Sequence, residues 1–180
     1  MTQTSTLSLA EFLTQSDIES SPAWEWLLSR PIQKPMPTLF HSRLQRHLVN
    51  WINAQTRSWE AVQELRCIVP PDSPVPDIVV VPCHRLGATD GPLQGAPDWL
   101  IEIRSPGQNT LDLQAKILHC LRHETQLAWL IDWERQQVWV WAGGDLPHIY
   151  TAADALPTLG DLPTITVAEV MQMTAQGKIP

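Results

Sequence analysis

The sequence predicts a single α/β domain spanning residues 1–180, in which a β-sheet is packed between helices. Three observations indicate this class. Extended apolar runs lie on both sides of a segment with helical spacing, and that order assembles most simply as an α/β sandwich. Hydrophobic residues make up 43% and charged residues 17% of the chain, the balance of a globular protein. At 180 residues, the chain has the length of one domain.

The first third of the chain predicts a helix, an extended hairpin and a second helix. Ser8 and Glu11 match the Ser-x-x-Glu capping box, which begins a short helix. Residues 24–34 read as an extended, hairpin-like segment that ends at a Pro-rich stretch. From residue 38 to about residue 54, apolar side chains recur at helical spacing, so an amphipathic helix is expected there.

The rest of the chain predicts a sheet with two further helices. β-branched and other apolar residues, separated by Pro and Gly, mark the strands. Strands are expected at residues 61–69, 78–81, 99–103, 126–133, 137–141 and near 148–150, and helices at about 110–123 and 166–176.

Two carboxylates stand out on the predicted strands. Asp77 follows Pro76 directly before one strand, and Glu102 lies within another. Because side chains alternate faces along a strand, Glu102 and Arg104 share a face. The residues between the strands, 83–97, are rich in Gly and Pro, which suits a long turn between paired neighbours. If the strands pair, Asp77 approaches Glu102.

A pair of carboxylates held together repels unless a proton or a cation lies between them. Oxygen ligands of this kind suit Mg²⁺ or Mn²⁺, and such a cation polarises a phosphodiester and lowers the pKa of an attacking water. The spacing also fits a plainer interpretation, because an Asp after Pro often begins a strand and a strand Glu can face solvent.

The same residues resemble a known pattern. A Pro-Asp pair, a long gap and then Glu-x-basic on a strand resemble the PD-(D/E)XK nuclease superfamily. More narrowly, the chain resembles the bacterial Uma-type family of restriction-endonuclease-like proteins, from about Glu11 to the terminal helix. The matching segments follow the family's order: 24–26 and 33–37 for an opening hairpin, 41–45 for the first core helix, 64–67, 75–80, the signature segment 95–106, then Asp112-x-x-x-Lys116 and 128–132.

The resemblance implies a restriction endonuclease-like core, with a mixed central sheet flanked by helices and an N-terminal hairpin. It implies that Asp77 and Glu102 are metal ligands, with the main-chain carbonyl of Ile103 as a further ligand and Glu64 as an outer acid. It also implies Mg²⁺ or Mn²⁺ as cofactor.

The position of the superfamily's lysine differs in this chain, because Arg104 occupies it. A guanidinium stays protonated and cannot act as a general base, although it can stabilise negative charge on a phosphoryl group. In relatives the lysine function migrates to the following helix, and the resemblance therefore favours Lys116 over Arg104. The alternative for Lys116 is an ion pair with Asp112, one helical turn earlier.

Three histidines are ambiguous. His41 precedes Leu44 and Leu48 at helical spacing, so it faces either the site, as a group that orients substrate, or the core. His119 and His123 are an i, i+4 pair that a metal could bridge, but no third ligand lies nearby in sequence, and a surface position is expected.

Charge and composition bound the partners. The formal net charge is −7, which argues against coating nucleic acid by bulk electrostatics. No stretch approaches the roughly 20 apolar residues of a membrane span, and we expect a cytoplasmic protein without membrane contact. Four of the nine tryptophans, Trp129, Trp133, Trp139 and Trp141, lie in the predicted late hairpin, for which we expect a homodimer contact.

Three functions remain open from the sequence. The leading one is a metal-dependent endonuclease that hydrolyses phosphodiester bonds in DNA, with Asp77 and Glu102 holding the cation and Lys116 or Arg104 stabilising the transition state. The second is a nuclease-like fold without catalysis that binds DNA or a protein. The third treats the Trp-rich hairpin as a face that recognises carbohydrate or protein.

Overall fold

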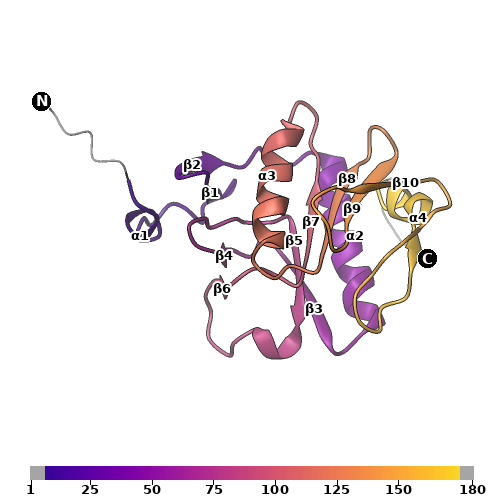
Figure 1. Cartoon of the computed structure of the whole chain (residues 1–180), viewed down its shortest axis with the longest axis horizontal. Helices are drawn as coiled ribbons and strands as arrows, with labels where there is room; N and C mark the ends of the chain where they lie inside the picture. The colour runs from indigo at the N-terminus through magenta and orange to yellow at the C-terminus, as the bar shows by residue number, and fades with distance from the viewer. Residues whose placement is uncertain (1–6, 175–180) are drawn as a thin grey trace, which may run out of the picture.

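The computed structural model describes residues 7–174, in which a six-stranded sheet lies between two long helices (Figure 1). Four short elements precede or flank the core: α1 (Leu9–Phe12), η1 (Cys83–Arg85), β4 (Cys67–Ile68) and β6 (Leu93–Gln94). The hairpin comprises β1 (Trp24–Leu27) and β2 (Arg30–Gln33), and the long helices are α2 (Leu39–Gln55) and α3 (Thr110–Leu121). The sheet strands are β3 (Trp59–Gln63), β5 (Ile78–Pro82), β7 (Trp99–Ile103), β8 (Leu127–Asp132), β9 (Gln137–Trp141) and β10 (His148–Thr151). The chain closes with β11 (Ala155–Leu156), β12 (Ile165–Thr166) and α4 (Val167–Gln172).

The sheet is mixed, as the sequence predicts. Its strand order is β10-β9-β8-β7-β5-β3, with β7 and β8 parallel and the other neighbours antiparallel. Parallel neighbours need a crossover, and α3 supplies it by connecting the end of β7 to the start of β8. This connection sets α3 against one face of the sheet.

The two faces carry separate apolar cores. On one face, α2 packs Leu44, Leu48 and Ile52 against alternate residues of β7 and β8, such as Ile101 and Trp129. On the other face, α3 contributes a second cluster, which lies over the remaining residues of the same strands. The alternation of side chains along β7 therefore explains both cores.

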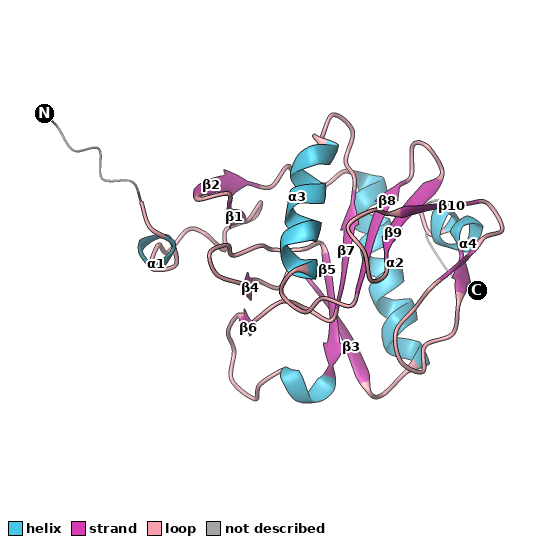
Figure 2. Cartoon of the chain, in the orientation of Figure 1, coloured by secondary structure: helices cyan, strands magenta, loops and turns pink. Residues whose placement is uncertain are grey.

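The hairpin β1–β2 lies beside α3, away from the far sheet edge formed by β10 (Figure 2). Two main-chain hydrogen bonds between Trp26 and Ser73, of 3.1 and 2.8 Å, tie it to the segment before β5. Arg66 is buried and donates to the carbonyl oxygens of Trp24 and Ile18, at 2.7 and 3.2 Å. These contacts hold the hairpin close to the start of β5.

Most predicted elements are present, with two differences. The expected strand at 61–69 is divided into β3 and β4, because Glu64 has a left-handed φ of 48°, which breaks the extended backbone. The final helix ends at Gln172 in the described part, and residues 175–176 of its expected range lie outside the described residues. Within residues 7–174, no helix is both long and apolar enough to cross a membrane.

The side chains of the four late tryptophans pack mainly in the interior of their own chain. Trp129 and Trp141 are 0% and 1% exposed, and Trp133 and Trp139 pack partly buried against the two cores. Trp129 also makes an edge contact with Trp99, with ring centroids 4.7 Å apart. The aromatic count of the hairpin is therefore explained by core packing.

Candidate active site

The two predicted acids lie opposite one another on neighbouring antiparallel strands. β5 pairs with β7 through Ile78 with Ile101 and Val79 with Leu100, so one further step places Asp77 opposite Glu102. Directly opposed residues of an antiparallel pair share a face, with Cβ atoms about 4.5–5.5 Å apart. The structure therefore brings Asp77 and Glu102 together at one end of the strand pair.

Asp77 is held by cations and by the backbone. Its side chain is buried, its Oδ2 accepts a 2.8 Å hydrogen bond from the Ile103 N–H, and its Oδ1 accepts one of 2.8 Å from Lys34 Nζ. His41 Nε2 lies 3.5 Å from the same oxygen. Burial alone would raise the pKa of Asp77, but the Lys34 ammonium and His41 outweigh it and hold this pKa far below its usual value. Asp77 is therefore a carboxylate at all working pH values.

The surroundings of Glu102 shift its pKa in the opposite direction from that of Asp77. It is 1% exposed, and its Oε1 accepts no hydrogen bond from any described residue, although Lys116 Nζ lies 3.1 Å away. Burial, and then the negative charge of Asp77, raise the pKa of Glu102 to about 7, against the lowering effect of Lys116 and Lys34. The Lys116 ammonium is thus the partner of this buried oxygen, as an ion pair.

Lys116 reaches Glu102 from α3. Lys116 directly precedes Ile117, which belongs to the apolar stripe of that helix, and it is 3% exposed. Burial lowers its pKa, but the charges of Glu102, Glu25 and Asp77 raise it above the usual value of 10.5. The Lys116 side chain therefore stays an ammonium ion, and it pairs with Glu102 and Glu25 instead of the Asp112 expected from local spacing.

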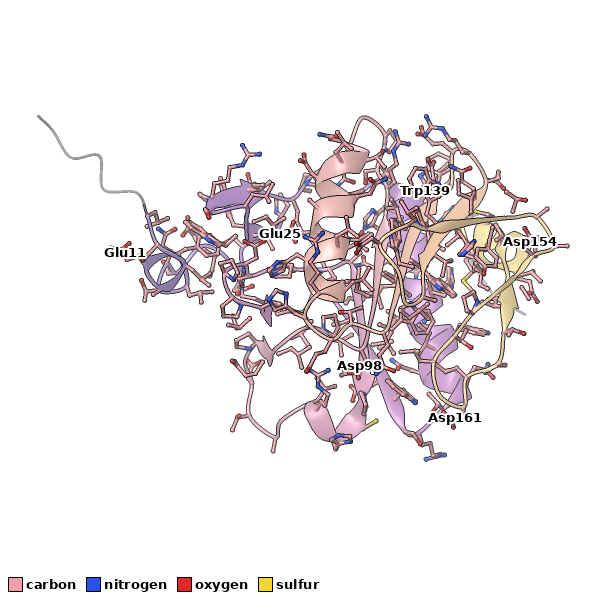
Figure 3. The ribbon with its side chains drawn as sticks, in the orientation of Figure 1. Glu11, Glu25, Asp98, Trp139, Asp154 and Asp161 are labelled. Atoms are coloured by element: carbon pink, nitrogen blue, oxygen red, sulfur yellow. The ribbon has the colours of Figure 1, made fainter. Side chains whose placement is uncertain are left out.

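Two residues of the site, Glu25 and Lys34, were not among those predicted from the sequence. Glu25, in β1, lies beside α3 (Figure 3), and its Oε1 accepts from Lys116 Nζ at 2.7 Å and from the Val75 N–H at 2.7 Å. Lys34, one residue after β2, donates to the Val75 carbonyl at 2.9 Å and lies 3.7 Å from Glu64. Both belong to segments that carry the family resemblance, 24–26 and 33–37, and that signal was available in the sequence.

The remaining predicted groups surround Asp77. His41 faces the site: its Nδ1 lies 3.2 Å from Ser105 Oγ, and it is 5% exposed. Burial lowers the pKa of His41, but the Asp77 carboxylate reverses the shift and raises it. Glu64, predicted as an outer acid, is exposed, and its Oε1 lies 3.7 Å from Lys34 Nζ.

Comparisons with known proteins agree with this arrangement. A family model described as "Uma2: Putative restriction endonuclease" matches residues 9–170. The chain belongs to the Uma2 family. A solved structure described as a "putative nuclease belonging to DUF820" from Anabaena variabilis is 34% identical, with a TM-score of 0.85 over 93% of this chain and 98% of that chain. A search of curated proteins gave no match. The family and the nuclease-like fold expected from the sequence are both confirmed.

In this Uma2-family chain, Arg104 lies outside the acid cluster. The register of β7 with β8 places it opposite Asp132, and its Nη1 lies 3.5 Å from Asp132 and 2.9 Å from Glu134. Arg104 and Glu102 share a face, as alternation predicts, but the guanidinium turns to the neighbouring strand. Lys116 is therefore the cation in contact with Glu102.

His119 and His123 have structural partners. His119 Nε2 lies 2.7 Å from the Val69 carbonyl, and His123 Nδ1 lies 2.8 Å from the carbonyl of His119. Among the described residues, no group of three or more His, Cys, Asp or Glu side chains is arranged to hold a metal ion. A cation in this protein would therefore need main-chain or water oxygens in addition to two carboxylates.

The residues at the Asp77 end of the strands fit such a cation. Asp77 and Glu102 are buried carboxylates on opposed residues, Asp77 is anionic, and the N–H and C=O of one strand residue point to the same side, so the Ile103 carbonyl faces the Asp77 edge. A small cavity of about 10 Å³, close to the size of one water molecule, adjoins Asp77, His41 and Lys34. The cation would have to replace Lys34 at Asp77 Oδ1.

Proposed function

We propose that the chain is a metal-dependent nuclease that hydrolyses phosphodiester bonds in DNA. The observation that carries this proposal is the pair of buried carboxylates, Asp77 and Glu102, directly opposite one another on neighbouring strands. Two carboxylates held together in this way repel unless a proton or a cation lies between them. Family membership supports the same chemistry.

Asp77, Glu102 and the Ile103 carbonyl would hold Mg²⁺ or Mn²⁺, hard cations that prefer oxygen ligands. When bound, the cation would polarise the phosphodiester and lower the pKa of an attacking water. Hydrolysis then forms a bond between the water oxygen and phosphorus and breaks one P–O ester bond, and the leaving oxygen takes up a proton.

Lys116 would stabilise the negative charge that develops on the phosphoryl oxygens, because it remains an ammonium ion in a site from which water is largely excluded. Glu25 is a positioning residue: it holds the Lys116 ammonium at 2.7 Å while accepting from the Val75 backbone. Lys34 balances Asp77 when no cation is bound, and it releases the carboxylate when one binds.

The test compares the wild-type protein with Glu102→Gln on labelled single-stranded and double-stranded DNAs, with Mg²⁺ or Mn²⁺. We expect the substitution to lower the cleavage rate at least 100-fold, about the effect of removing one electrostatic group from a catalytic site. Glu60→Gln, at an exposed carboxylate of the edge strand β3, is the matched control and should retain full activity. Equal cleavage by wild type and Glu102→Gln would overturn the assignment.

A nuclease-like fold without catalysis is the alternative outcome. Lys34 at Asp77 and Arg104 in the superfamily's lysine position both favour it. A protein that binds DNA but cleaves none of these substrates with either metal ion would establish that alternative.

We also propose, separately, that the chain forms a homodimer. β10 is an edge strand of the sheet, and Ile149 on it and Leu146 before it are 55% and 83% exposed. Sedimentation at micromolar concentration should give twice the mass of 20.3 kDa. A monomer at that concentration would end this proposal.

A further inference from the structure

A cleft leads from the surface to the acid cluster. It lies between the hairpin β1–β2 and the start of α3, and its volume is about 330 Å³. Leu27 and Ile32 line it from the hairpin, Pro106 and Leu113 from the other side, and Lys34 and Lys116 are shared with the acid cluster. The small cavity beside Asp77 adjoins this cleft, because Lys34, Pro35 and Gln108 line both. A group in the cleft therefore lies next to Lys34 and Lys116, the two cations that contact the acids.

The acids are recessed. Asp77 is 3% exposed and Glu102 is 1% exposed, and the hairpin and the 106–108 segment form the walls in front of them. The phosphates of a B-form duplex lie along a stiff rod, and bending that rod over a few base pairs is costly. An unpaired strand can turn single nucleotides and their phosphates inward. The walls of the cleft therefore favour an unpaired strand.

The charge of the cleft leads to the same conclusion. Duplex binding relies on several Lys and Arg contacts along the phosphate backbone. Among the residues that line the cleft, Lys34 and Lys116 are the cations, and both are paired with carboxylates inside it. The whole chain has a formal net charge of −7. This distribution offers one place for a phosphate at the base of the cleft, without a wide cationic footprint.

One part of the cleft wall is apolar, beside polar lining residues such as Glu25, Gln108 and Asp112. Leu27, Ile32 and Leu113 line it, and Leu28 and Leu111 at neighbouring positions are 59% and 70% exposed. A nucleobase has an apolar face that can pack against them, and base stacking of this kind tolerates different sequences.

We propose that this hairpin cleft binds one unpaired nucleotide, and that the substrate of the site is therefore single-stranded or locally melted DNA. A volume of about 330 Å³ is at the lower end for ligand pockets, which suits one nucleotide. The substrate class rests on the proposed nuclease function, whereas binding of the unpaired nucleotide is measurable without it.

The first test measures binding by fluorescence anisotropy, with Ca²⁺ in place of Mg²⁺. A fluorescein-labelled 12-nucleotide single strand and the duplex of the same sequence are compared at one fixed salt concentration. We expect the single strand to bind at least 10-fold more tightly. Equal affinities, or tighter binding of the duplex, would overturn the proposal.

Variants of the cleft sharpen this test. Ile32→Trp fills the cleft and should weaken single-strand binding at least 10-fold, whereas Ala168→Trp, at an exposed position of helix α4, should leave it unchanged. Asp112→Asn removes a negative charge from the exposed mouth and should tighten single-strand binding two- to five-fold. Asp112→Asn keeps the proposal falsifiable if Ile32→Trp does not fold, and unchanged affinity in either folded variant contradicts it.

Hydrolysis of a chromogenic phosphodiester tests the nuclease chemistry separately from nucleotide binding in the cleft. Hydrolysis of bis(p-nitrophenyl) phosphate with Mn²⁺ that is lost in Glu102→Gln reports the nuclease chemistry without any nucleic acid. If this hydrolysis occurs but duplex DNA binds better, the substrate class is wrong and the proposed function stands. If single strands bind preferentially and no phosphodiester is hydrolysed, the cleft stands and the nuclease proposal fails.

Discussion

The two faces of the central sheet are built on the same strands but are stabilised in different ways. The face under α2 is apolar throughout its cluster, from Leu48 to Ile101 and Trp129. The face under α3 is apolar in its middle, but at the end of β7 it places Glu102, Lys116 and Glu25 together, each nearly inaccessible to solvent. An apolar contact holds at any pH, whereas a buried charge is stable only with its partners. The difference locates function on the α3 face.

The largest stability change should come from removing the central cation. Lys116→Ala leaves Glu25 and Glu102 buried without it, and breaking such a cluster by removing one partner costs about 3–5 kcal/mol. Urea denaturation at pH 7 should show a loss of that size. The triple variant Glu25→Gln, Glu102→Gln, Lys116→Met should recover most of it, and a loss below 1 kcal/mol in Lys116→Ala would show that the cluster is not coupled.

The apolar face should respond differently. Leu48→Ala removes a fully buried side chain from the α2 core and should cost about 3 kcal/mol, within the usual range for core Leu→Ala changes. The loss should be the same at pH 5 and pH 8, and with or without Mg²⁺, since no titrating group is involved. A loss of stability that varies with pH or with Mg²⁺ would contradict this difference between the two faces.

The charged face should show a pH dependence set by Glu102. Its folded pKa of about 7 lies above the usual value of 4.5, so the folded state holds more protons between these values, and wild-type stability falls as pH rises through this window. The decrease is at most about 3 kcal/mol. Glu102→Gln lacks this pH-dependent decrease. The stability of Glu102→Gln relative to wild type should therefore be greater at pH 8 than at pH 5. Parallel curves from urea denaturation would contradict the assignment.

The smallest effect is expected at Arg104. Because its guanidinium faces Asp132 and Glu134, Arg104→Ala should reduce phosphodiester hydrolysis less than five-fold, about 1 kcal/mol of barrier. Lys116→Gln, assayed at a temperature where it is folded, should reduce hydrolysis at least 100-fold. Equal losses of hydrolysis rate in the two variants would indicate that Arg104 also stabilises the transition state.

The sequence predicted those features of the site that depend on local order. Asp77 after a proline and Glu102 in an alternating strand placed both acids on one face, because strand period and antiparallel pairing are local rules. The helical position of Lys116 next to Ile117 similarly placed it within reach. These predictions required no knowledge of distant contacts.

Features that depend on long-range packing were missed. Glu25 and Lys34 reach the site because the hairpin is docked by Trp26 against Ser73 and by the buried Arg66, none of which a local pattern contains. Likewise, the orientation of Arg104 depends on the parallel register with β8, which α3 sets from outside the strand. The sequence therefore predicts that the two acids and Lys116 converge, but not that Glu25 and Lys34 join them.

The most direct measurement is calorimetric titration of the purified protein with Mg²⁺ and Mn²⁺. The account predicts that the wild-type protein binds at least one of these ions, that Asp77→Asn abolishes the binding, and that the exposed control Glu60→Gln binds as wild type does. If wild type binds neither ion, or if Asp77→Asn binds as tightly as wild type, the acids opposite one another on β5 and β7 do not form a metal site.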